Sequence, residues 1–201
     1  MRLHRSRLRT VCALATFAFT LPFSSPLLAQ ETVLELDPAQ THIQFTLDAT
    51  LHTVHGTFKL KRGTVRFDPR TGKAGGQVVV DVTSGDTGNG GRDHKMHKEI
   101  LQSAEYPEAT FVPAQIQGSV NAQGDSQVAI QGVFKLHGSD HQITLNFNMK
   151  RAGDQLTVRT RLVIPYQQWG LKNPNTLFLR VSDRVDMDIQ AAGRLSAAPQ
   201  H

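Results

Sequence analysis

Two pairs of histidines in this chain have a spacing that could support metal chemistry. His52 and His55 are three positions apart, and so are His94 and His97. Because residues i and i+3 share one face of a helix, two such pairs could meet around a zinc or copper ion. The chain has no HExxH motif and no cysteine-containing zinc signature, so we assign no metal site. A periplasmic divalent-metal-binding protein that uses these four histidines is kept as the alternative hypothesis.

A charged pair, Arg92 and Asp93, follows the glycine-rich segment 85–91. An aspartate near the start of a helix interacts favourably with the helix dipole, and the exposed backbone N–H groups there attract phosphate. The pair could therefore bind an anionic head group. Alternatively, Asp93 caps the helix and Arg92 ties it to the rest of the fold, and this structural role is slightly favoured.

The helix itself is predicted over residues 92–102. Met96, Ile100 and Leu101 recur there at helical spacing between charged side chains. Tyr106 precedes a proline and is biased away from helical backbone, so the chain is expected to leave the helix extended and enter a strand. The stretch 85–112, which contains this helix, is the one part of the chain after residue 29 that is not patterned as strand.

Elsewhere, apolar and polar residues alternate with the period of a β-strand, as in 43–47, 143–149 and 185–191. A tight hairpin is expected at 61–63 and a further turn at 68–72. Eight to ten short strands with little helix favour a closed structure without exposed edges. We therefore predict an all-β fold: a single antiparallel, lipocalin-like β-barrel of about eight strands with one short helical insertion. A barrel of that size is either filled by side chains or holds one elongated ligand.

The apolar residues expected to face the barrel interior share the inward side of their strands or of the helix. They are Phe45, Leu47, Phe58, Leu60, Phe67, Val80, Met96, Leu101, Phe134, Leu136, Leu145, Phe147, Leu162 and Ile164, with Trp169 as an amphipathic wall or rim residue. The simplest interpretation of such a set is a protein core. Periodicity does not separate a solid core from a hollow one.

Several short motifs occur in a characteristic order. They are Asp37, Pro38 and Thr41; Gly56 and Phe58; Arg92, Asp93 and His97; Tyr106, Pro107 and Phe111; and the segment Val181 to Val185. With these motifs the chain resembles the YceI family of polyisoprenoid-binding proteins over essentially its whole length after residue 29. One departure is that Pro165 and Tyr166 stand where family members commonly have a basic residue, so no head-group contact is carried over from that strand.

The resemblance implies an exported binding protein that holds a long-chain isoprenoid lipid, of polyprenyl or quinone type, inside the hydrophobic barrel. The inward-facing residues would contact the lipid tail, and Arg92, His94, Lys95 or His97 would meet its head group. The isoprenoid lipid is the expected partner, and no cofactor is expected. The chain has no nucleophile elbow, P-loop or dinucleotide-binding fingerprint, so no enzyme activity is predicted.

The N-terminus is patterned as an export signal. Residues 1–29 contain a basic start, an apolar stretch and a small-residue cleavage site. Pro22 and Pro26 cut the apolar stretch short of the roughly 18 residues that a membrane span needs, so no stable membrane anchor is expected. The protein is therefore predicted to be periplasmic or extracellular, with a lipid-binding barrel at 30–193 and a flexible C-terminal tail at 194–201.

The charge and cysteine content depend largely on this signal. Cleavage removes four of the 22 Lys and Arg and none of the 17 Asp and Glu, which lowers the net charge from +5 to +1. No nucleic-acid partner is expected from such a balance. Cys12, the single cysteine, lies in the signal, so no disulfide is expected after cleavage. A homodimer and an association with a membrane redox partner are left open.

Overall fold

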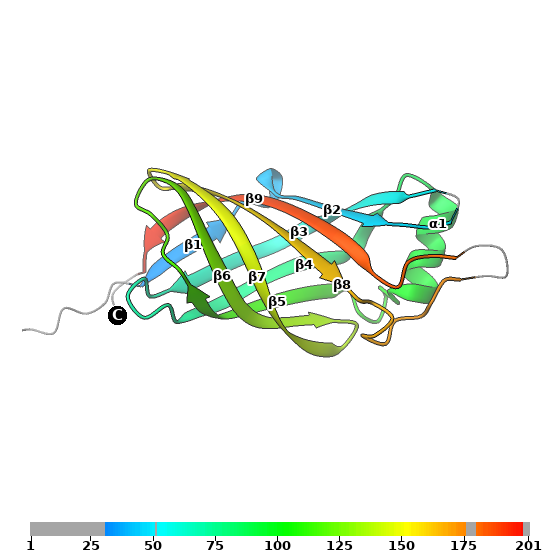
Figure 1. Cartoon of the computed structure of the whole chain (residues 1–201). Helices are drawn as coiled ribbons and strands as arrows, with labels where there is room; N and C mark the ends of the chain where they lie inside the picture. The colour runs from blue at the N-terminus through cyan, green and yellow to red at the C-terminus, as the bar shows by residue number, and fades with distance from the viewer. Residues whose placement is uncertain (1–30, 51, 176–179, 199–201) are drawn as a thin grey trace, which may run out of the picture.

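The computed structural model describes residues 31–50, 52–175 and 180–198 (Figure 1). The predicted signal peptide, residues 1–29, lies outside the described residues. Among the described helices, none combines the length and apolar character that crossing a membrane would require.

The described residues form nine strands and three short helical segments. The strands are β1 (Thr32–Leu36), β2 (His42–Leu47), β3 (Val54–Phe67), β4 (Ala74–Asp86), β5 (Glu108–Gln117), β6 (Gly124–Leu136), β7 (Ser139–Ala152), β8 (Gln155–Ile164) and β9 (Val185–Ala197). The helical segments are the 3-10 turn η1 (Pro38–Gln40), the α-helix α1 (Gly90–Lys95) and the π-helical turn η2 (Met96–Ile100). The helical insertion predicted at 92–102 is therefore confirmed, and it both begins and ends two residues earlier, at Gly90 and Ile100.

The strands close into an antiparallel barrel. From β3 to β9 each strand pairs with the next in sequence, and β1 and β2 both pair with β3 and with β9. The strands β1 and β2 thus occupy one position in the wall, end to end, with η1 between them (Figure 1). Nine strands fill eight positions, and the predicted lipocalin-like barrel is confirmed.

The hairpin predicted at 61–63 was wrong, because β3 runs through these residues with only a register shift between Leu60 and Arg62. Gly63 is explained by packing instead of by a turn. A Cβ atom on Gly63 would come within 2.7 Å of the Cδ1 atom of Leu36, so the glycine lets the end of β1 lie close against β3.

The flexible tail predicted from residue 194 was also wrong over its first part. Strand β9 extends to Ala197, which pairs with Thr32 of β1, and Leu195 is buried. Leu195 also continues the strand alternation beyond residue 193, so it gains burial and hydrogen bonds by staying in the sheet. Residues 199–201 lie outside the described part of the chain.

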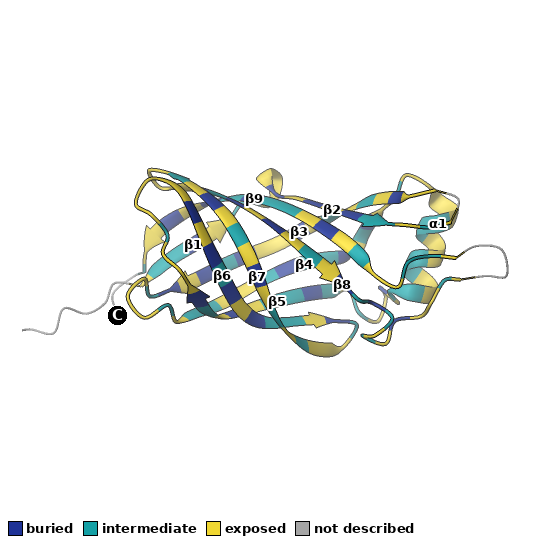
Figure 2. Cartoon of the chain, in the orientation of Figure 1, coloured by how far each residue is buried: buried dark blue, intermediate teal, exposed yellow. Residues whose placement is uncertain are grey.

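Buried and exposed positions alternate along the strands of the barrel (Figure 2). The buried side chains form two groups at opposite ends of the barrel. The group at the end of the barrel that carries β1 is called here the filled half. It contains Leu34, Val65, Phe67, Ile116, Val128, Ile130, Met149, Leu156, Val158, Ala191 and Leu195. The group below α1 is called the hollow half, and it includes Ile43, Phe45, Val54, Leu60, Val82, Ala109, Leu136, Ile164, Tyr166, Leu171 and Met187.

Candidate ligand cavity

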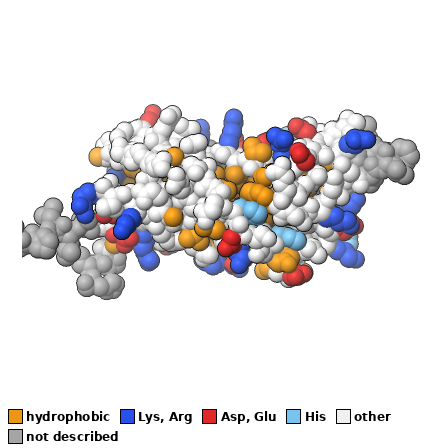
Figure 3. Space-filling model, turned by 60° about the horizontal axis from the view of Figure 1, so that its bottom comes forward, with side chains coloured by type: hydrophobic (Ala, Val, Ile, Leu, Met, Phe, Trp, Pro, Cys, Tyr) orange, Lys and Arg blue, Asp and Glu red, His pale blue; other side chains and the backbone are white. Residues whose placement is uncertain are grey.

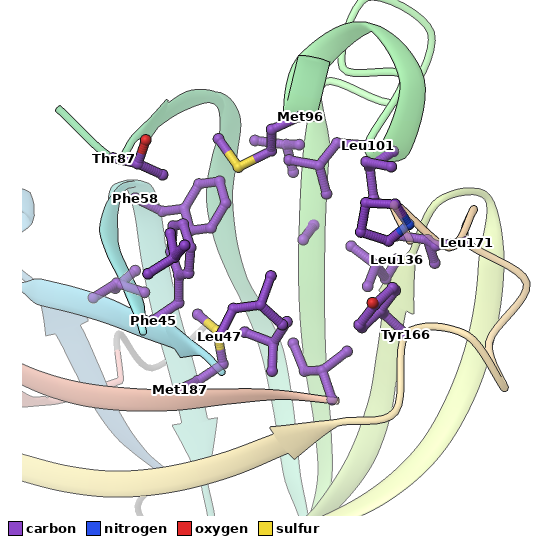
Figure 4. A pocket seen from close by; sticks show the side chains of 18 of the residues that line it. Phe45, Leu47, Phe58, Thr87, Met96, Leu101, Leu136, Tyr166, Leu171 and Met187 are labelled. Atoms are coloured by element: carbon purple, nitrogen blue, oxygen red, sulfur yellow. The ribbon is translucent and has the colours of Figure 1, made fainter. Parts of the chain in front are cut away.

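The hollow half contains an apolar cavity of about 280 Å³ (Figure 4). This volume is close to the lower end of the roughly 300–1,000 Å³ that is common for ligand pockets. The polar side chains in the lining are His52, Thr87, Arg92, Lys95 and Tyr166, and the others are apolar. The first four belong to the end of the barrel that α1 covers, so the cavity has an apolar body and one polar end.

Ten of the fifteen residues predicted to face the ligand line this cavity. They are Phe45, Leu47, Phe58, Val80, Met96, Leu101, Phe134, Leu136, Leu162 and Ile164. Eight of them sit on β2, β3, β4, β6 and β8 at inward-facing positions toward the α1 end of the barrel, and Met96 and Leu101 come from the helical insertion.

The other five predicted residues do not line the cavity. Phe67 belongs to the filled half, and Phe147 packs against that half. Leu60 and Leu145 are buried in the barrel wall. Trp169 is not a lining residue but contacts one, Phe134, with ring centroids 5.8 Å apart. The prediction that all fifteen residues line one cavity therefore does not hold for these five. Alternation identifies which residues of a strand face inward, but it does not tell where along the barrel axis they lie.

The structure adds lining residues that the sequence interpretation left out. They are Ala49, His52, Val54, Thr87, Ala109, Tyr166, Leu171, Pro174 and Val181, with Ile43, Val82, Val185, Met187 and Ile189 in alternating strand segments. Ile100, which the helical spacing grouped with Met96 and Leu101, also lies in the lining. Strand alternation could have identified Ile43, and also Val185, Met187 and Ile189 of β9, as inward-facing residues. No sequence signal pointed to Tyr166 and Leu171, which lie in the loop after β8.

The helical insertion covers the cavity with apolar side chains. Met96 and Leu101 extend from it toward the barrel interior, and Phe58 lies opposite Met96 (Figure 4). A Cβ atom on Gly85 of β4 would come within 2.7 Å of Phe58 and 2.9 Å of the Met96 methyl group. The glycine at this position therefore allows the insertion to lie directly on the wall.

A polar clasp at Thr87 fixes the start of the insertion. The Arg92 guanidinium donates from Nε to the Thr87 hydroxyl at 2.7 Å and from Nη2 to the Thr87 carbonyl at 3.0 Å. The Asp93 carboxylate accepts from the Thr87 hydroxyl and from its backbone N–H. These hydrogen bonds, with that of the hydroxyl the strongest, hold the pKa of Asp93 below its ordinary value.

The cap of α1 is Asn89, whose side chain accepts from the Arg92 N–H at 3.0 Å. The prediction that Asp93 caps the helix was therefore wrong, because its carboxylate is used by Thr87. The predicted role of Arg92 as a tie between the insertion and the barrel is supported by the clasp.

Two of the four predicted head-group residues lie away from the cavity lining. His94 is exposed on α1. His97 is half-buried, with Nε2 at 2.9 Å from the Gly85 carbonyl and Nδ1 at 3.0 Å from the Ser103 hydroxyl. Its position makes it a link between the insertion and β4, which leaves Arg92 and Lys95 as the head-group candidates at the cavity.

The histidine pairs do not converge on a metal geometry within the described residues. No group of three His, Cys, Asp or Glu side chains in that part of the chain could hold an ion. His55 is engaged through Nδ1 with the Thr46 hydroxyl at 3.2 Å, and both ring nitrogens of His97 have protein partners. The geometry thus gives the metal-binding alternative no support.

The wall of the hollow half is opened between β7 and β8. Their pairing stops at Phe147 and Thr160, after which β7 pairs with β6 and β8 with β9 as the two strands diverge (Figure 1). The loop after β8 crosses this gap, and Trp169 stacks on His141 with ring centroids 3.9 Å apart. Hydrophobic side chains reach the surface beside histidine on this side of the molecule (Figure 3).

Tyr166 anchors that loop. Its side chain lines the cavity, and its hydroxyl donates to the Ser182 carbonyl at 2.7 Å. Burial raises the pKa of Tyr166 above its ordinary value, which keeps the hydroxyl protonated as a donor. The gap in the strand pairing is thus covered by an anchored loop.

An eight-position antiparallel barrel with a covered apolar cavity belongs to the class of small barrels that have room for one ligand. Comparison with known sequences narrows this class. The sequence profile of the YceI-like domain matches residues 34–192, and the chain belongs to this family. The UPF0312 proteins of Pseudomonas savastanoi pv. phaseolicola and Pseudomonas syringae pv. syringae are each 28% identical to it over 181 residues, which cover 83% of this chain and 87% of theirs.

Solved structures of two other proteins share the fold. BcnA from Burkholderia cenocepacia superposes with a TM-score of 0.64 and 19% identity, covering 78% of this chain and 98% of that protein. A polyisoprenoid binding domain from Saccharophagus degradans, implicated in plant cell wall breakdown, superposes with a TM-score of 0.60 and 19% identity, covering 81% and 98%. At this identity the likeness concerns the fold.

Proposed function

We propose that this protein binds the hydrocarbon chain of an isoprenoid lipid in the cavity of the hollow half. The observation that carries the proposal is that a single barrel is filled at one end and hollow at the other, with apolar walls around the hollow part. Membership of the YceI-like family and the polyisoprenoid binding domain among the structures of similar fold give it further support.

The energetics of such binding follow from apolar burial. Each buried methylene contributes about 0.8 kcal/mol, so about ten of them contribute ~8 kcal/mol. That corresponds to a micromolar dissociation constant before the cost of ordering the flexible chain is subtracted. A branched prenyl chain needs only the apolar walls that Phe45, Phe134 and Leu162 exemplify.

The lining suits binding without turnover. Among the described lining residues there is no Asp, Glu, Ser or Cys, and the single histidine is His52. A covalent or general-base mechanism needs a free nucleophile beside a base. The two hydroxyls of the described lining are already used in structural hydrogen bonds, that of Thr87 with Arg92 and Asp93 and that of Tyr166 with the Ser182 carbonyl. We therefore propose a carrier or reservoir, and, from the pattern of residues 1–29, one that acts in the periplasm or outside the cell.

The test is native mass spectrometry with organic extraction of the protein purified from a membrane-containing bacterial host. We expect an isoprenoid species at one molecule per chain. Leu162→Trp, which places a larger side chain in the cavity, should abolish retention. Val163→Trp is the matched control, because the adjacent side chain points outward and is 49% exposed.

The proposal is wrong if the wild-type protein carries no isoprenoid and takes up no farnesol when it is offered. It is also wrong if Leu162→Trp, still folded by circular dichroism, retains as much lipid as Val163→Trp.

A further inference from the structure

The cavity occupies only part of the length of the barrel. On β6 and β8 the inward-facing residues nearest to the insertion line the cavity, whereas those farther along the same strands belong to the filled half. On β6, Phe134 lines the cavity, Ile130 belongs to the filled half, and Gly132 is the inward-facing position between them. The boundary between the two halves therefore lies at the level of Gly132.

The ring of Phe111 lies at this boundary. Phe111 is on β5, where it is opposite Phe134 in the strand pairing, and it packs against the filled half. A Cβ atom on Gly132 would come within 2.8 Å of the Cε2 and Cζ atoms of Phe111, so the ring takes the space of a side chain on β6. Phe111 thus has a lining residue on one side and the filled half on the other.

Three further side chains lie at the same level. Val78 of β4, which is opposite Phe111 in the strand pairing, packs against both groups of buried residues, and so does Leu36 at the end of β1. On β8 the next inward-facing residue after Leu162 is Thr160, which is 5% exposed and whose hydroxyl is hydrogen-bonded to β7. The four side chains of Leu36, Val78, Phe111 and Thr160 are called here the floor of the cavity.

The volume above the floor limits how much hydrocarbon chain can be buried. An apolar protein cavity of about 150 Å³ holds one benzene molecule. On the same scale, the 280 Å³ of this cavity hold about twice as many carbon atoms, which corresponds to about two to three prenyl units. Below the floor, the interior is occupied by the buried side chains of the filled half.

The gap between β7 and β8 is not a free exit for a longer chain. Trp169 of the loop after β8 stacks on His141 of β7 and contacts Phe134 of β6. Tyr166 holds the start of the same loop through its hydrogen bond to the Ser182 carbonyl. A chain that left the cavity by this route would have to displace Trp169 from both of its aromatic partners.

We propose that the cavity accommodates a prenyl chain of about two to three units and that Phe111, as part of the floor, sets this length. The proposal rests on the proposed function, since it specifies the chain of the ligand in that same cavity. Prenyl units beyond this length stay in water and add no affinity, because apolar burial is what drives the binding.

The probes are geraniol, farnesol and geranylgeraniol, which share one head group and differ by one prenyl unit at each step. We expect lipid-depleted wild-type protein to bind farnesol at least about tenfold more tightly than geraniol, because more apolar surface is buried. Geranylgeraniol should bind within about threefold of farnesol, because its additional unit finds no place above the floor. The measurement is competition native mass spectrometry at concentrations below the aggregation of each alcohol.

Two variants assign the limit to Phe111. Phe111→Ala removes a phenyl ring about the size of one prenyl unit, so geranylgeraniol should then bind at least about tenfold more tightly than farnesol. Phe111→Leu, which perturbs the packing less, should give a smaller gain in the same direction. Phe67→Ala is the matched control, because it removes the same ring from the filled half away from the floor and should leave the limit unchanged. Circular dichroism verifies the fold of each variant.

The outcomes separate this proposal from the proposed function. If the wild-type protein binds geranylgeraniol at least about tenfold more tightly than farnesol, the length limit is overturned and chain binding stays intact. If folded Phe111→Ala and Phe111→Leu keep the wild-type limit, or if Phe67→Ala shifts it equally, Phe111 does not set the length. If none of the three alcohols binds, the proposed function itself is refuted.

Discussion

The filled and hollow halves of the barrel are built from the same strands and the same alternation, yet one is a core and the other a cavity. In the filled half β7 and β8 are paired from Phe147 to Ala152, and β1 is held between β3 and β9. In the hollow half β7 and β8 diverge, and the helical insertion and the loop after β8 cover the opening. Because these strands diverge, the inward-facing side chains of the hollow half lie farther apart. They therefore line a space that they do not fill.

The two halves also differ in how their covers are held. The filled half is held by contacts between buried apolar residues. The insertion over the hollow half packs Met96, Ile100 and Leu101 against the buried residues beneath it. It is fixed in addition by polar contacts, which are the Thr87 clasp, the His97 link to Gly85 and the hydrogen bond of 2.7 Å between Gln102 and His137. Polar contacts add little free energy each, so we expect the hollow half to be the less stable of the two.

The largest effect is expected from Leu156→Ala in the filled half. Leu156 is 2% exposed, so its truncation should leave a cavity that neighbours cannot collapse into and cost about 3–4 kcal/mol. Chemical denaturation of the lipid-depleted protein measures this cost. A loss below about 1 kcal/mol would show that this end is not close-packed.

A smaller loss, about 2–3 kcal/mol, is expected from Leu101→Asp, which places a carboxylate among the apolar side chains beneath the insertion. The control is His94→Asp at an exposed position of α1. Equal melting temperatures for the two variants would show that the insertion does not cover the cavity. The hollow half would then not differ from the filled half in having a separate cover.

Phe134→Ala should cost still less, about 1–2 kcal/mol, although it removes a larger side chain than Leu156→Ala does. The reason is that one side of Phe134 already faces the cavity, so fewer contacts are lost. The same denaturation experiment serves here, together with lipid retention, which should fall. A loss of about 4 kcal/mol or more, with no change in retention, would mean that the hollow half is filled in solution.

The smallest effect concerns pH and the Thr87 clasp. Because the pKa of Asp93 is lowered in the folded protein, its contribution to stability is present above the unfolded value of about 3.8 and is lost as pH falls through the lower folded value. Asp93→Asn should therefore lose less stability than the wild type between pH 5 and pH 3, an interval chosen around that value. Parallel curves for the two proteins would show that the carboxylate adds nothing to the cover.

Sequence patterning was sufficient for the barrel because alternation repeats on nearly every strand. For the same reason it identified eight of the ten predicted residues that line the cavity, and helical spacing identified the other two, Met96 and Leu101. It failed at Phe67 and Phe147, since alternation carries no information on where along the axis the strands diverge. It also failed at Gly63, where the glycine serves packing against Leu36 and not a turn.

The buried residues of the loop after β8 could not be predicted from the sequence, for a different reason. Tyr166 and Leu171 have neither strand nor helix periodicity, and their burial depends on the gap between β7 and β8 that the loop crosses. The clasp at Thr87 was half predicted, since Arg92 was identified as a tie while its partner was not.

The most direct test of a hollow, ligand-holding half is a crystal structure with a bromine-labelled farnesol, read from the anomalous difference map. If the hollow half holds the ligand, one bromine peak should lie within the cavity, among Phe45, Phe134 and Leu162. A peak among Leu34, Val128 and Leu156 in the filled half, or peaks confined to the outer surface, would contradict it.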